Sequence, residues 1–148
     1  MKIHLVNQQK DLKLDRILWR KAIKEVAALQ NETFEEVTLH FVTQDAICQL
    51  HDDYFNDPSP TDCISFPIDG PDEPHRILGD VFICPKTAID YTHKNGGDPE
   101  REALLYGIHG MLHLFGYDDM TPEERQKMRR YEKKHLKNLE AKGIIQAL

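Results

Sequence analysis

The chain has 148 residues, of which 40% are hydrophobic and 30% charged, and this is the size and composition of one ordinary soluble domain. Its net charge of −6 argues against indiscriminate binding to nucleic acids. No apolar run approaches the ~18 residues of a membrane span, and the N-terminal stretch MKIHLVNQQK lacks the apolar core of a signal peptide. We therefore expect a cytoplasmic protein that does not enter the membrane.

The first part of the chain alternates predicted strands and helices. Residues 3–7 and 37–43 have the apolar pattern of strands, and helices are expected over about 11–30 and 44–54. The two prolines of 56–60 then open a loop. The apolar stripe of the first predicted helix consists of Leu14, Ile17, Leu18, Ile23, Val26 and Ala27.

Two further strands are predicted over 61–67 and 79–85, separated by a loop at 68–75 that is rich in Pro, Gly and Asp. A short helix is expected over 86–94, before Asn95, Gly96 and Gly97.

The last two helices carry start signals. Asp98 is expected to cap a helix that Pro99 begins, and Thr121 with Glu124 forms a capping box for a final helix that runs to about Gly143. The inward face of that helix is predicted to be Met128, Tyr131, His135 and Leu139. Together the elements indicate an α+β fold in one domain, residues 1–148, with a mixed sheet of about four strands covered by about five helices.

Charge is unevenly distributed along the chain. Residues 1–30 carry seven Lys or Arg against three acids, residues 121–148 carry eight against four, and residues 31–120 carry four against eighteen. In the final segment a basic stripe recurs every four residues, at Arg125, Arg129, Lys133 and Lys137. Such a stripe is either a solvated helix face or a surface that attracts a phosphate backbone.

Cys48, Cys63 and Cys84 are isolated and odd in number, so the sequence offers neither a disulfide framework nor a CxxC zinc ribbon. We expect buried, reduced thiols.

The segment LLYGIHGMLHLFGYDDM contains the strongest chemical signal. His109 and His113 are four residues apart, so on a helix two imidazoles can converge on one cation. Gly116 can end the helix in a left-handed conformation and let Asp119 return as a third ligand, with Asp118 as its competitor. Two imidazoles and one carboxylate with an open fourth position are typical of catalytic zinc. The alternative is that both histidines merely belong to a buried helix.

HGMLHLFGYDD, residues 109–119, resembles the signature HGxLHLxGYDH of the YbeY family, metal-dependent endoribonucleases associated with maturation of bacterial ribosomal RNA. Ten of its eleven positions agree, and Asp119 replaces the last histidine. PTDCISFP at 60–67 and LGDVFIC at 78–84 are similar to the family's PTDVLSFP and LGDIVIS. The three motifs occur in the family's order.

The resemblance implies a YbeY-like fold and one Zn²⁺ per chain, with His109, His113 and Asp119 as its ligands and, through the metal, as catalytic residues. It implies a single-strand-specific endoribonuclease that acts in 16S rRNA 3′-end maturation and ribosome quality control. The expected partners are rRNA and the small ribosomal subunit with its associated proteins, and the protein is expected to be a monomer or weak oligomer.

Two departures from the family pattern affect the expected chemistry. The carboxylate of Asp119 lowers the charge around the metal by one unit, which weakens it as a Lewis acid. Phe55 stands where the family has an Arg that would contact phosphate. Substitute cations in the acidic middle would have to be Arg76, Lys86 or Arg101.

The matched motifs also contain Thr61, Asp62, Ser65 and Asp80. These residues either cap turns and strand ends or support the site, with Asp62 or Asp80 orienting a ligand histidine. Of the other histidines, His51, which precedes the TDCISF segment, is the one with a candidate role near the site.

Two other functions remain open at this point. A zinc peptidase would need a general base, but the Glu of HExxH motifs is replaced by Gly110. A non-catalytic, ribosome-associated RNA-binding protein would use the metal only to tie residues 116–120 to the preceding helix.

Overall fold

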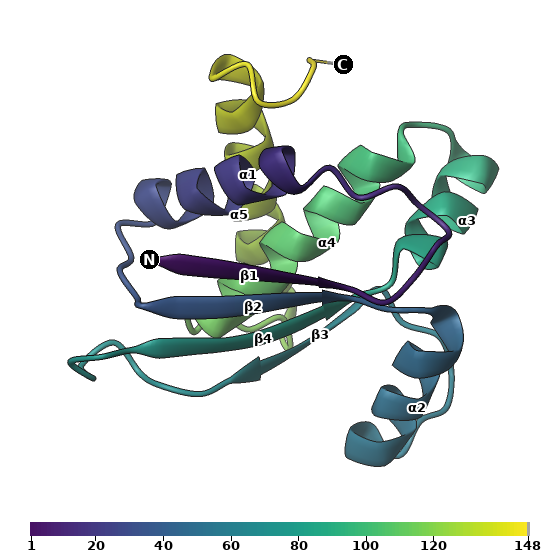
Figure 1. Cartoon of the computed structure of the whole chain (residues 1–148), viewed down its shortest axis with the longest axis horizontal. Coiled ribbons are helices and arrows are strands. Elements are labelled where there is room, and N and C mark those ends of the chain that lie inside the picture. The colour runs from purple at the N-terminus through teal and green to yellow at the C-terminus, as the bar shows by residue number, and fades with distance from the viewer. Residues whose placement is uncertain (148) are drawn as a thin grey trace.

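The computed structural model describes residues 1–147, and within them four strands form one sheet (Figure 1). The strands are β1 (Lys2–Asn7), β2 (Glu36–Phe41), β3 (Cys63–Pro67) and β4 (Ile77–Ile83), in the order β1-β2-β4-β3. β1, β2 and β4 run parallel, whereas β3 pairs antiparallel with β4. The predicted mixed sheet is thus confirmed.

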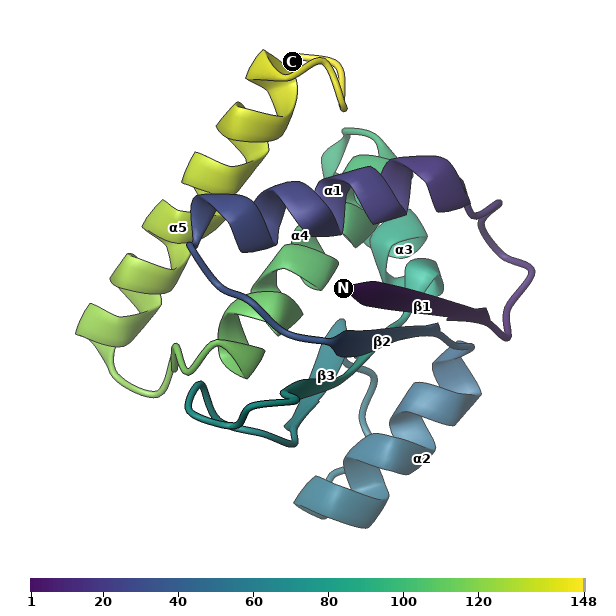
Figure 2. The same ribbon diagram turned by 60° about the vertical axis from the view of Figure 1, so that its left-hand side comes forward.

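Helices cover the two faces of this sheet unequally. The described residues contain α1 (Arg16–Leu29), α2 (Gln44–Phe55), α3 (Pro85–Asn95), α4 (Pro99–Leu114) and α5 (Pro122–Ala141). α1, α4 and α5 lie over one face, α3 packs against α4, and α2 lies on the other side of the sheet (Figures 1 and 2). No helix within residues 1–147 combines the length and apolar character needed to cross a membrane.

The predicted start of the first helix at residue 11 is wrong, because α1 begins at Arg16. The Asp15 carboxylate accepts a hydrogen bond from the Leu18 amide and so acts as the N-cap. Upstream, the Gln9 side chain donates to the Leu12 carbonyl at 2.7 Å and accepts from the Leu12 amide at 2.9 Å. These bonds hold residues 9–12 in a turn rather than a helix.

Other boundaries differ by a few residues. The strand predicted over 79–85 is Ile77–Ile83, because Pro85 already begins α3. β3 begins at Cys63 instead of residue 61, and the final helix ends at Ala141.

Both predicted helix starts near the motif are confirmed. Asp98 accepts a hydrogen bond from the Arg101 amide at the start of α4. At the start of α5, the Thr121 hydroxyl accepts from the Glu124 amide at 3.1 Å, and the Glu124 carboxylate accepts from the Thr121 amide at 3.0 Å. The Thr121 cap fixes where α5 begins, directly after the loop that contains Asp119.

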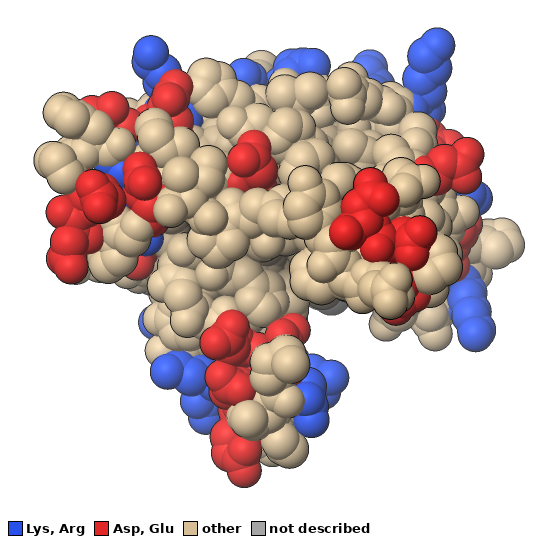
Figure 3. Space-filling view, turned by 90° about the horizontal axis from the view of Figure 1, so that it is seen from below, with Lys and Arg blue, Asp and Glu red and all other residues tan. Residues whose placement is uncertain are grey.

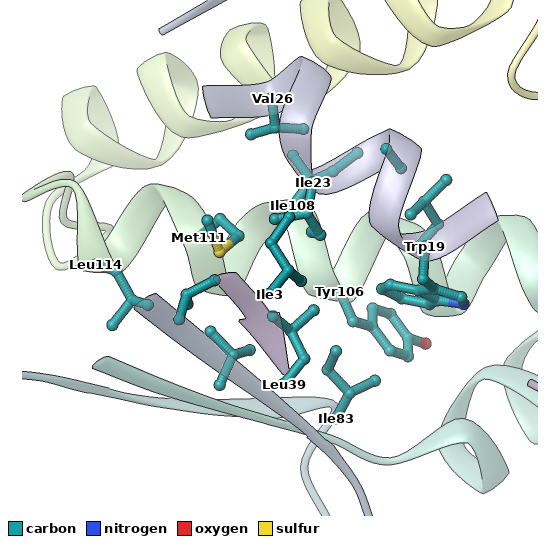
Figure 4. Close-up of a cluster of buried hydrophobic side chains, with 14 of the residues drawn as sticks. Ile3, Trp19, Ile23, Val26, Leu39, Ile83, Tyr106, Ile108, Met111 and Leu114 are labelled. Atoms are coloured by element: carbon teal, nitrogen blue, oxygen red, sulfur yellow. The ribbon is translucent and has the colours of Figure 1, made fainter. Parts of the chain in front are cut away.

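The main core lies between the sheet and the three helices above it (Figure 4). α4 packs closely against its neighbours at two glycines. A Cβ added to Gly107 would lie 2.6 Å from Cζ3 of Trp19 on α1, and one added to Gly110 would lie 2.4 Å from Cγ1 of Val81 on β4. Since a real side chain does not fit in either place, Gly107 allows α4 to approach α1 and Gly110 allows it to lie directly on the sheet. The large side chains buried in this core include Trp19, Ile23, Leu39, Ile83, Ile108 and Met111.

A smaller cluster lies under α2 and consists of Val42, Ile47, Ile64 and Cys84. Ile47 is the one residue of α2 that is buried. All three cysteines are free, as predicted, but Cys48 and Cys63 are partly exposed and Cys84 alone is buried. On the last helix Met128, His135 and Leu139 are buried as predicted, whereas Tyr131 is half-buried.

Candidate metal centre

The two histidines of the motif project from the last two turns of α4 toward the same point. Their Nε2 atoms are 3.0 Å apart. α4 ends at Leu114, and Gly116 then adopts a φ of 101°, which only glycine tolerates readily. The amide of Tyr117 donates to the carbonyl of Leu112 at 3.0 Å, so the chain turns back toward the helix end.

The turn brings Asp119 to the two imidazoles. Its Oδ2 atom lies 3.3 Å from His109 Nε2 and 3.5 Å from His113 Nε2. A tetrahedral ion with ligands at 2.0–2.2 Å separates neighbouring ligand atoms by about 3.4 Å. The donor types and their spacing therefore fit a zinc-like ion. Asp118 lines the adjoining cavity, but it is Asp119 that completes the three-residue group.

A fourth residue, Glu132 of α5, contacts one of the candidate ligands. His109 Nδ1 lies 2.8 Å from Glu132 Oε2, and the Glu132 side chain is only 15% exposed. When Nδ1–H donates to this carboxylate, Nε2 carries no proton and is free to bind a metal. Sequence reasoning missed Glu132. The available signal was its position on the inward side of the final helix, one turn after Met128.

Opposing effects act on the pKa of His109. Burial lowers this pKa, but the hydrogen bond and negative charge of Glu132, together with the charges of Asp62 and Asp119, outweigh burial and raise it above its ordinary value. A metal that binds at Nε2 therefore has to displace a proton at low pH.

An open cavity of about 460 Å³ adjoins the ligand group. Its floor is β3 with the turn before it, one wall is the end of α4 with the loop to α5, and the other wall is α2. The residues that line it, besides the three ligands, are His51, Phe55, Thr61, Asp62, Cys63, Ile64, Ser65, Pro67, Asp118 and Met120. A substrate can therefore reach the fourth position of a bound ion.

Two of the three predicted supporting residues lie at this cavity. The Ser65 hydroxyl donates to the Gly110 carbonyl at 3.0 Å and so ties β3 to α4. The Asp62 carboxylate accepts from the Cys63 amide at 2.7 Å, which is the strand-end role considered for it. Neither side chain has a hydrogen bond to a ligand histidine in the described structure.

Asp80 lies away from the cavity. Its Oδ1 atom is 2.8 Å from His40 Nε2, and its neighbour Val81 contacts α4 at Gly110. Because successive side chains of a strand point to opposite faces, Asp80 projects from the face turned away from α4. The orienting role considered for Asp80 is taken by Glu132 instead.

Cys63 is the one cysteine among the residues that line the cavity. Burial raises the pKa of its thiol well above the ordinary value, and the charges of Asp62, Glu132 and Asp119 raise it further. The residue therefore stays a neutral thiol near pH 7, which is a poor nucleophile.

No Lys or Arg is among the residues that line the cavity. The three cations considered from the sequence are engaged elsewhere: Arg76 pairs with Glu32, Lys86 with Asp90 and Arg101 with Glu140. One member of the predicted basic stripe, Arg125, contacts the loop beside the cavity, where its Nη1 donates to the carbonyls of Asp119 and Met120. Arg125 thereby ties the ligand loop to the start of α5.

An α+β fold that presents two helix-borne imidazoles and a loop carboxylate to an open cavity has the arrangement typical of metal-dependent hydrolases. The chain belongs to the YbeY family: the sequence model described as Endoribonuclease YbeY matches residues 4–140. The resemblance inferred from the three motifs is therefore confirmed.

Relatives of similar length support this membership. The chain is 44% identical to an Endoribonuclease YbeY from Protochlamydia amoebophila, over 93% of this chain and 92% of the relative. It is 38% identical to an Endoribonuclease YbeY from Chlamydia felis, over 98% and 95% of the two chains. The solution structure of TM1509 from Thermotoga maritima superposes with a TM-score of 0.69 at 23% identity, covering 95% of this chain and 91% of that one. This last likeness confirms the fold.

Proposed function

We propose that this protein hydrolyses phosphodiester bonds of single-stranded RNA with one Zn²⁺ held by His109, His113 and Asp119. The observation that carries the proposal is the convergence of these three ligand atoms, all within 4.8 Å of one another, beside an open cavity. The proposed biological reaction is maturation of the 16S rRNA 3′ end and ribosome quality control. The protein would then bind its RNA on the small ribosomal subunit in the cytoplasm. It would act there as a monomer or weak oligomer.

Family membership defines the class of reaction. Members of the family and the relatives described above are named endoribonucleases, so this chain is an RNA-cleaving hydrolase. Single-strand specificity and the particular rRNA are the finer parts of the proposal.

A zinc ion at this site would polarise a phosphoryl oxygen and lower the pKa of a bound water. The chain's own residues prepare the site for that chemistry. Glu132 keeps the proton of His109 on Nδ1. Ser65 holds β3 against α4 through the Gly110 carbonyl, and Arg125 holds the loop that contains Asp119. These contacts fix the ligand geometry before substrate binds.

Two observations bear on the other functions considered. Peptide hydrolysis of the HExxH type needs a Glu at the position of Gly110, where Val81 leaves no room even for a Cβ. A purely structural metal is usually enclosed by four protein ligands, whereas three are brought together here and the cavity leaves the fourth position accessible. Both observations favour the nuclease.

The direct test uses the purified full chain with single-stranded RNA, duplex RNA and casein. We expect cleavage of single-stranded RNA that a chelator stops and added Zn²⁺ restores, with little cleavage of the duplex and none of casein. RNA binding without cleavage in the zinc-loaded protein would leave the non-catalytic function standing. Casein cleavage would favour the peptidase.

A further inference from the structure

Exposed apolar side chains gather at the rim of the cavity. Within residues 1–147, seven large hydrophobic side chains are exposed, and two of them, Phe55 at 57% and Met120 at 80%, line the cavity. Phe55 comes from the α2 wall, and Met120 comes from the loop between α4 and α5. Apolar side chains that line an open cavity offer a surface on which an apolar part of a ligand can pack.

Phe55 is exposed but well held. It is the last residue of α2, and Asn56 ends the helix in the left-handed conformation with its amide bonded to the Asp52 carbonyl. The His51 ring lies one turn earlier, 5.7 Å from the Phe55 ring between centroids. His51 Nδ1 donates to the Ser59 carbonyl at 2.9 Å, so the following loop is tied back to α2. The ring of Phe55 is thus presented by a fixed helix end.

The charges of the cavity limit what can hold a substrate there. Its acidic side chains are Asp62, Asp118 and Asp119, and no Lys or Arg accompanies them. Figure 3, which views the molecule from the α2 side, shows acidic side chains gathered in several clusters over this face and Lys and Arg mainly at its edges. A phosphate near the metal would therefore receive no cationic side chain from the cavity wall.

We propose that Phe55, together with Met120, forms a subsite that stacks an unpaired nucleobase of single-stranded RNA beside the phosphate at the metal. Stacking on an aromatic ring does not need positive charge and accepts every base. Paired bases of a duplex cannot reach the ring without unpairing, so the subsite supplies a physical cause for single-strand specificity. The inference rests on the proposed function in taking RNA as the substrate.

The test measures binding rather than cleavage. A short single-stranded RNA with cleavage-resistant phosphorothioate linkages carries the fluorescent base 2-aminopurine at each position in turn and is titrated with the zinc-loaded full chain. We expect stacking to quench the fluorescence for the base that occupies the subsite. Phe55→Ala should abolish this quenching and weaken binding roughly 5- to 100-fold, whereas Phe55→Trp should restore both. Tyr91→Ala is the matched control, because Tyr91 is an exposed aromatic residue of α3 outside the cavity lining.

An abasic nucleotide at the quenched position completes a double-mutant cycle. It should weaken binding to the wild type as much as Phe55→Ala does and have no further effect on that variant. Absence of quenching with the wild type overturns the subsite, and so do additive effects in the cycle. An RNA affinity that Phe55→Ala leaves unchanged also overturns it, and is the result expected if a protein partner contacts Phe55 instead. Cleavage of RNA without quenching contradicts the subsite but leaves the nuclease proposal intact. Quenching without cleavage supports the subsite for RNA binding but contradicts the nuclease proposal.

Discussion

The two walls of the cavity are built in different ways. The α4 wall is buried along most of its length, is anchored to the sheet through Gly110 and Ser65, and receives Glu132 from α5. The α2 wall buries only Ile47 of its own helix and presents Phe55 to solvent. One wall is held by packing on several sides, and the other rests on a small cluster.

In the proposed function, the α4 wall carries the metal ligands and the α2 wall only contacts the substrate. Metal ligands need positions accurate to a fraction of an ångström, and a densely packed helix supplies them. A wall that only touches substrate can change its surface without disturbing the core. Phe55, at the position where the resemblance predicted an Arg, is such a change, whereas Asp119 keeps an oxygen within reach of the ion proposed at the two imidazoles.

The largest expected effect is on the α4 wall itself. His113→Ala removes one of three ligand atoms, so metal should be lost on dialysis and RNA cleavage should fall by at least about 100-fold. Elemental analysis and a cleavage assay measure the two effects, and circular dichroism verifies the fold. Cleavage at the wild-type rate by this variant would exclude the metal from the mechanism.

Glu132→Gln tests whether support of the ligand matters as much as the ligand. The variant keeps an oxygen near His109 Nδ1 but removes the charge, and metal affinity should fall about 10- to 100-fold. His51→Gln is the matched control on the α2 wall, because it alters the hydrogen bond of 2.9 Å between His51 and Ser59, which is similar in length to the bond of 2.8 Å between His109 and Glu132. Competition with a metal-binding dye gives both affinities. Equal losses in the two variants would contradict the contrast between the walls.

Gly110→Ala tests the close packing of α4 on the sheet. The new Cβ would lie 2.4 Å from Val81 Cγ1 and 3.1 Å from Ser65 Oγ, so we expect the free energy of unfolding to fall by about 1–3 kcal/mol. Urea unfolding measures this change. Gly70→Ala serves as control, because no heavy atom lies within 4 Å of its added Cβ. The packing argument fails if both variants are equally stable.

The smallest expected effect concerns stability behind α4 rather than at either wall. Burial, with a contribution from Lys134, lowers the pKa of His135 to about 4, and its Nε2–H donates to Gln30 Oε1 at 2.8 Å. As the pH falls below ~6.5, His135 becomes protonated in the unfolded chain but stays neutral in the native protein. The free energy of unfolding therefore decreases as the pH falls from ~6.5 to about 4.

His135→Gln removes this titration. Its loss of unfolding free energy between pH 6.5 and 4 should be smaller than that of the wild type, by on the order of 1 kcal/mol after allowance for screening. Urea unfolding at several pH values makes the comparison. Parallel pH profiles would show that His135 is not the group responsible.

Local patterns identified much of the site. His109 and His113 could be paired from the sequence because residues four apart on a helix always lie on one side of it. The caps at Asp98 and Thr121 involve partners within three residues, so their bonds were also predictable. The start of the first helix was not predictable in this way. The apolar stripe continues upstream of α1, but the hydrogen bonds between the Gln9 side chain and the Leu12 backbone keep this upstream segment out of the helix.

By itself, the sequence determined the order of elements, the mixed sheet, the family and the grouping of His109, His113 and Asp119, since each of these leaves a short-range pattern or a motif. Only the tertiary structure decided that Glu132 supports His109, that Asp80 faces away, and that Phe55 borders the cavity. These contacts join helices and strands that are remote along the chain. Their partners are set by the packing of whole elements against one another, for which no local spacing rule exists.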